Sequence, residues 1–121
     1  VIFTHHIGDL NIDHQVTFQA VATATRPMTD EIVKTIICFE TPSGTEWIPS
    51  TDLRKFNPNM YVEISLLNLN SKIKAMESYN YEKRKFPHPR SPESLKILAE
   101  FRGINVGLKL AESFSIIRNI N

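Results

Sequence analysis

Three of the four histidines lie within ten residues of one another near the start of the chain. They are His5, His6 and His14, and the segment that holds them, residues 4–14, also carries Gly8, Asp9 and Asn11. An apolar, β-branched stretch precedes the segment and a helical pattern follows it, so it occupies the loop after a strand. Ligand sites in α/β sheets lie at the carboxyl ends of strands. The segment is therefore the first candidate for a metal or substrate site.

His14 is the leading candidate ligand, because the pattern places it in the first turn of a helix that Asp13 is expected to cap. The positive end of the helix dipole disfavours imidazolium and favours neutral imidazole, the form that binds metal. The alternative, that His14 only packs or hydrogen-bonds at a helix start, stays open on spacing alone. His5 and His6 point to opposite sides of an extended chain, so at most one faces the site. We assign His6 to substrate binding, and Asp9 is a weaker candidate.

The second candidate site is the segment 87–91, in which two prolines flank His88 and stiffen the backbone around it. A stiff loop aims a side chain at little entropic cost. We expect His88 to stabilise an oxyanion and Arg90 to bind a substrate oxygen. The alternative is a proline-rich loop with a solvated histidine and arginine ahead of an ordinary helix cap.

Several other chemistries lack support. The single cysteine, Cys38, lies in an apolar run, which predicts a buried, reduced residue and excludes a cysteine cluster for zinc. No glycine-rich phosphate loop is present, and the serines of residues 41–55 have no histidine near them in sequence. A net charge of +1 gives no reason to expect a nucleic-acid partner. No apolar run approaches the roughly 18 residues of a membrane span, and no signal peptide is visible, so we expect a cytoplasmic protein without membrane contact.

The elements that must position these side chains alternate along the chain. Strands are predicted over residues 1–4, 35–40, 61–65 and 114–117. Helices are predicted from residue 14, from residue 66 after a capping Ser65, and from Pro92 after a capping Ser91. The pattern predicts an α/β protein, a Rossmann-like layered fold with a largely parallel sheet. Because the chain begins inside a strand, we expect the fold to be incomplete, with its N-terminal part missing.

Two separated stretches together resemble the PIG-L/LmbE-like family of zinc-dependent N-acetylglucosaminyl deacetylases. The first comprises residues 4–14 and 20–27, and the second begins at residues 87–91 and continues through 102–103 to 111–114. Residues 56–59 and 72–79 lie between them, so the resemblance covers nearly the whole chain. Each motif alone is modest, but their order and spacing together are fairly specific.

The resemblance implies that His14 binds zinc together with a histidine and an aspartate of an early Ala-His-Pro-Asp-Asp motif, whose other aspartate is the general base. Zinc would polarise an acetamide carbonyl and activate water, and His88 would stabilise the tetrahedral intermediate. The early motif does not occur here, and Asn11 stands where many members have a histidine. Asn11 can donate a hydrogen bond but cannot act as a titrating acid.

We therefore expect residues 1–121 to be the C-terminal portion of a single deacetylase domain that acts on an N-acetylated sugar. The chain alone is expected to be inactive, to bind zinc weakly, and to form homo-oligomers through an uncovered sheet edge. An alternative is a non-catalytic sugar-binding or assembly module of the same fold. A nucleotide-using α/β protein is a third possibility, which no phosphate-binding loop supports.

Overall fold

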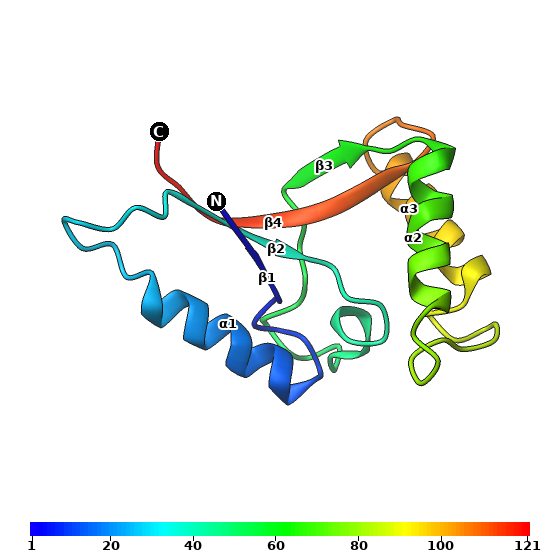
Figure 1. Cartoon of the computed structure of the whole chain (residues 1–121), viewed down its shortest axis with the longest axis horizontal. Coiled ribbons are helices and arrows are strands. Elements are labelled where there is room, and N and C mark those ends of the chain that lie inside the picture. The colour runs from blue at the N-terminus through cyan, green and yellow to red at the C-terminus, as the bar shows by residue number, and fades with distance from the viewer. The chain divides into compact units, whose positions relative to one another are not determined.

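The computed structural model describes all 121 residues, and they form two compact units. The first unit comprises residues 1–60 and 114–121, and the second comprises residues 61–113. Figure 1 labels the helices and strands of both units. No helix of either unit combines the length and the apolar composition needed to cross a bilayer.

The chain contains four strands, three α-helices and one short 3₁₀ helix. The strands are β1 (Ile2–Thr4), β2 (Thr35–Phe39), β3 (Met60–Glu63) and β4 (Ala111–Asn119). The helices are α1 (Ile12–Ala24), η1 (Thr45–Trp47), α2 (Leu66–Glu77) and α3 (Pro92–Ile104). All four predicted strands and all three predicted helices are therefore present, so the α/β class is confirmed.

The sheet has the order β1-β2-β4-β3 and is mixed, so the prediction of a largely parallel sheet is wrong. β1 pairs with β2 in parallel, and β2 pairs with β4 antiparallel. Toward β3, the amide of Asn59 donates to the carbonyl of Phe114 and the amide of Ile64 donates to the carbonyl of Leu110. These partners run in opposite order, which is the antiparallel pattern. Two helices, α2 and α3, lie between β3 and β4 in the chain. A single helix would leave β4 parallel to β3, and the second helix lets β4 run in the opposite direction.

The core of the first unit is centred on β2, where Ile36, Ile37 and Cys38 are buried. Their β-branched and apolar side chains suit a strand that is covered on both faces. Cys38 is fully buried and unpaired, and burial raises the pKa of its thiol to about 12. The prediction of a buried, reduced cysteine is confirmed.

Helix α1 begins two residues earlier than expected. Asn11, rather than Asp13, is its N-cap, and the Asn11 side-chain oxygen accepts a hydrogen bond from the Asp13 amide. Asparagine and aspartate are equally good caps, so the local pattern could not choose between them. His14 nevertheless lies in the first turn, as predicted.

In the second unit, α2 packs against α3. Ser65 caps α2 through a reciprocal capping box, and Ser91 caps α3 with Pro92 in the first helical position, as predicted. The buried residues of α3 are Leu95, Ala99 and Gly103. Val106 lies beyond the end of the helix and is 43% exposed.

Candidate metal centre

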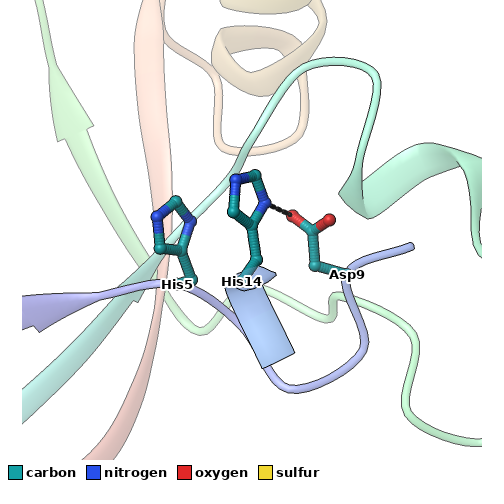
Figure 2. A group of neighbouring side chains, drawn as sticks. All are labelled: His5, Asp9 and His14. Carbon is teal, nitrogen blue, oxygen red and sulfur yellow. Dashed lines mark ion pairs between the residues drawn. The ribbon is translucent and has the colours of Figure 1, made fainter. Parts of the chain in front are cut away.

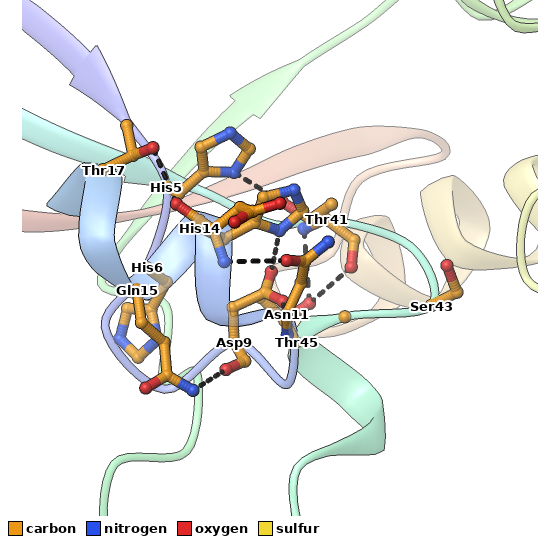
Figure 3. Close-up of polar contacts among 12 residues, drawn as sticks. His5, His6, Asp9, Asn11, His14, Gln15, Thr17, Thr41, Ser43 and Thr45 are labelled. Atoms are coloured by element: carbon orange, nitrogen blue, oxygen red, sulfur yellow. Dashed lines mark hydrogen bonds and ion pairs between the residues drawn. The ribbon is translucent and has the colours of Figure 1, made fainter. Parts of the chain in front are cut away.

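The loop between β1 and α1 is folded around Asp9. The backbone amide of Asp9 donates to the carbonyl of His6, and the Asp9 carbonyl accepts a hydrogen bond of 2.7 Å from the Gln15 side chain. The amide of Asn11 donates to Asp9 Oδ1 at 2.8 Å. These bonds bring the end of β1 and the start of α1 together, and Figure 3 shows the polar side chains that gather there.

Three potential ligands meet at this point: His5, Asp9 and His14 (Figure 2). Each offers one ligand atom, and these atoms lie within 4.8 Å of one another. We call this group the His5–Asp9–His14 cluster. Asp9 Oδ2 lies 3.0 Å from His14 Nδ1. The side chain of Asp9 is completely buried, whereas that of His14 is 23% exposed.

The two imidazole rings of the cluster stack on each other. The ring centroids of His5 and His14 are 3.8 Å apart and the rings are within 6° of parallel. The edge of Phe39 packs against His5, and Thr41 Oγ1 lies 3.5 Å from His5 Nδ1. Burial lowers the pKa of His5, the charge of His14 lowers it further, and the Asp9 carboxylate opposes these effects. His5 is therefore held toward the neutral form that binds metals.

Gly44 forms the wall of the cluster behind Asp9. A Cβ atom at position 44 would lie 2.5 Å from both carboxylate oxygens of Asp9, closer than real Cβ atoms approach any heavy atom. The amide of Leu10 donates to the Gly44 carbonyl, which fixes the two segments in register. The carboxylate thus sits directly against backbone, in a space that admits no further side chain.

The short contact between the Asp9 carboxylate and the His14 ring requires a proton or a cation between the two atoms. Asp9 Oδ2 and His14 Nδ1 are buried and 3.0 Å apart, yet neither atom has a hydrogen-bond partner of good geometry. Heavy-atom positions do not establish which nitrogen of a neutral histidine carries the proton. A carboxylate oxygen and a bare imidazole nitrogen would repel at this distance, so a proton or a cation has to lie between them. The donor set of imidazole nitrogen and carboxylate oxygen fits zinc.

The cluster contains His14, the predicted metal ligand, but the histidine beside it is not the His6 that we assigned to the site. His14 is central, and Asn11 lies beside it as the α1 cap. The structure brings His5 rather than His6 to His14. The His6 ring is buried edge-on against Phe56, its Nδ1 accepts a hydrogen bond from the Gly8 amide, and burial lowers its pKa.

His88 and Arg90 belong to the second unit, whereas the cluster belongs to the first. The backbone amide of Arg90 donates to His88 Nδ1 at 3.1 Å, so the stiff loop orients the ring through its own backbone. The Arg90 side chain pairs with Glu82 and lines a cavity of about 730 Å³, where Lys83 and Lys85 add positive charge. Glu77 and Glu93 also line the cavity, so its lining carries charges of both signs.

Sequence reasoning did not select His5, and it ranked Asp9 only as a weaker candidate, although a signal for each was present. Strand alternation separates the side of Thr4 and His6, which is buried, from the side of Phe3 and His5. It does not say which side α1 covers, and that choice decides which histidine meets His14. Asp9 is separated from His14 by only four residues, but its role depends on a loop that turns back on itself.

A scan against protein-family models finds no match for this chain, and searches of curated proteins and of solved structures find none either.

Proposed function

We propose that the His5–Asp9–His14 cluster is part of a zinc site, and that the protein is a zinc-dependent hydrolase that removes an N-acetyl group from an amino sugar or sugar conjugate. The zinc part of the proposal is supported by the position of His14 in the first turn of α1, with the buried carboxylate of Asp9 beside its Nδ1. The deacetylase part rests on the resemblance of residues 4–14 and 87–91 to the PIG-L/LmbE-like family. The observation that carries the proposal is the buried Asp9 carboxylate beside the imidazole of His14.

The same resemblance implies a Rossmann-like layered fold. The pairing of β1 and β2 supports it, because the two strands are parallel and α1 connects them. Ligand sites in such folds lie at the carboxyl ends of the strands, which is where the cluster follows β1. The remaining metal ligands and the general base are proposed to come from a family motif that this chain does not contain.

When bound, zinc would supply a Lewis acid for the acetamide carbonyl and would lower the pKa of a water molecule. In the proposal His14 binds the metal as a neutral imidazole. Asn11, at the start of α1, donates a hydrogen bond to the reacting group. The resemblance implies that His88 would stabilise an oxyanion, and we propose that Arg90 binds a substrate oxygen.

The proposal is tested by assaying the natural-length protein for release of acetate from N-acetylglucosamine and its conjugates. We expect activity that a chelator removes and that added zinc restores. His14→Ala should abolish it, whereas Thr17→Ala, one turn further along the same helix, should not. Sugar binding without acetate release would favour the non-catalytic module instead. Activity that is indifferent to chelator and to His14→Ala would contradict the proposal.

A further inference from the structure

The 3.0 Å contact between Asp9 Oδ2 and His14 Nδ1 has two chemical explanations. In one, a metal ion bridges the two atoms, and Asp9 is itself a ligand. In the other, a proton on Nδ1 lies between them, and Asp9 orients the ring while the opposite nitrogen, Nε2, is left to bind metal. The two explanations assign Asp9 different roles and leave different nitrogens of His14 available.

The surroundings of Asp9 disfavour a bridging ion. The carboxylate is completely buried, Oδ1 is already occupied by the Asn11 amide, and the Gly44 backbone closes the space behind it. A catalytic metal keeps an open position for water or substrate. An ion held between Asp9 and Nδ1 would be enclosed on the carboxylate side with no such position.

The stacking of the His5 ring on the His14 ring also argues against one metal ion bound by both histidines. The lone pair of an imidazole nitrogen lies in the plane of its ring. Rings that are 3.8 Å apart and nearly parallel direct their lone pairs alongside each other rather than toward one point. In this arrangement His5 covers the face of the His14 ring and holds it in place, and it does not share an ion with it.

The second ring nitrogen of His14, Nε2, lies on the side of the ring away from Asp9 (Figure 2). Nδ1 is buried, while the side chain as a whole is 23% exposed. Figure 2 shows the second ring nitrogen directed away from the carboxylate. Histidines that bind metals almost always donate their other N–H to a carboxylate, a backbone carbonyl or water, which fixes the tautomer.

We propose that Asp9 is a positioning residue: it accepts the Nδ1 proton of His14, and so presents the bare Nε2 atom to the metal. The zinc part of this inference rests on the proposed function. The tautomer itself does not, because it is a property of the metal-free chain.

The first test is the ¹⁵N NMR spectrum of the His14 ring in the metal-free 121-residue chain at about pH 8, where free histidine is neutral. The two ring nitrogens of each tautomer have distinct chemical shifts. We expect the form protonated at Nδ1. A ring protonated at Nε2 would overturn the inference, and this measurement requires no variant.

The second test is Asp9→Asn, which keeps the shape of the side chain. The Asn11 amide needs an acceptor, so the new amide oxygen should stay at the Oδ1 position and the new NH₂ group should face Nδ1. We expect His14 to change to the tautomer protonated at Nε2. Asp13→Asn is the matched control, because Asp13 is adjacent to His14 in sequence but its side chain is exposed. It should leave the tautomer unchanged.

The third test is titration of the natural-length protein with zinc chloride, followed in the ¹⁵N spectrum of the same ring, because the remaining proposed ligands lie outside residues 1–121. We expect zinc to shift the Nε2 resonance, and Asp9→Asn to weaken binding by about ten- to a hundredfold. A zinc-dependent shift of Nδ1 would identify Asp9 as a co-ligand and would overturn the inference. A wild-type ring that is protonated at Nδ1 but does not respond to zinc would support the positioning role and contradict the proposed zinc site.

Discussion

The carboxylate of Asp9 lies against Gly44, with no room between the two residues for a side chain at position 44. Both residues come from loops, one before α1 and one after β2, and they are far apart in the sequence. The candidate site therefore depends on a backbone contact as well as on its titratable groups. This contact also gives the most direct way to disturb the cluster without altering any of its ligands.

Gly44→Ala should destabilise the first unit and displace Asp9, because its Cβ would lie 2.5 Å from both carboxylate oxygens. Overpacking of this kind costs about 1–3 kcal/mol. Urea denaturation measures the loss. The control is a double-mutant cycle with Asp9→Ala, which removes the carboxylate and should relieve most of the cost of the Gly44→Ala substitution. Equal losses in both backgrounds would show that the carboxylate is not the obstacle.

Asn11→Ala should lower the free energy of unfolding by about 1 kcal/mol, because the Asn11 side chain caps α1 by accepting the Asp13 amide. Asn11→Asp keeps the capping oxygen and should cost much less. Thermal or urea denaturation of the two variants checks this. If both variants were equally destabilised, the cap would not be the reason for asparagine at this position.

Stability should fall as the pH is lowered through the range in which His6 titrates. Burial lowers the pKa of His6 in the folded state below its ordinary value of about 6.5. Between these two pKa values the unfolded chain binds more protons than the folded one, so the free energy of unfolding rises with pH. The contribution of His6 is fully present above about pH 6.5. Protonation would also remove the acceptor that Nδ1 offers to the Gly8 amide.

Urea denaturation at a series of pH values measures this dependence. His6→Asn supplies a neutral acceptor in place of the ring and should reduce the slope. It should not remove the slope entirely, because burial also lowers the pKa of His5. A slope of unchanged size in His6→Asn would mean that other groups cause the acid sensitivity.

Gly103→Ala should destabilise the second unit although alanine favours helix. A Cβ atom at position 103 would lie 2.6 Å from the backbone oxygen of Leu108, which cannot move as a flexible side chain would. The overpacking cost of about 1–3 kcal/mol should exceed the gain in helix propensity of about 1 kcal/mol. Lys96→Ala, at an exposed position of α3, is the control and should change stability little. A stabilised Gly103→Ala protein would contradict the close packing of α3 against the Leu108 backbone.

Local patterns were sufficient to predict most of the secondary structure. The capping serines Ser65 and Ser91 mark the starts of α2 and α3, because a helix start depends on groups within a turn of it. The β-branched run of β2 and the lone buried Cys38 were likewise recognisable in sequence. The position of His14 in the first turn of its helix belongs to the same class.

The direction of the strands and the composition of the cluster were decided only by the tertiary structure. Strand pairing joins residues that are far apart, such as Cys38 and Ser115, and no local pattern reports whether such partners run parallel or antiparallel. The same holds for Asp9. Its burial depends on Gly44, and its partner His14 becomes its neighbour only when the loop closes. The sequence by itself determined which residues are able to bind a metal, because that follows from side-chain chemistry, but only folding decided which of them meet.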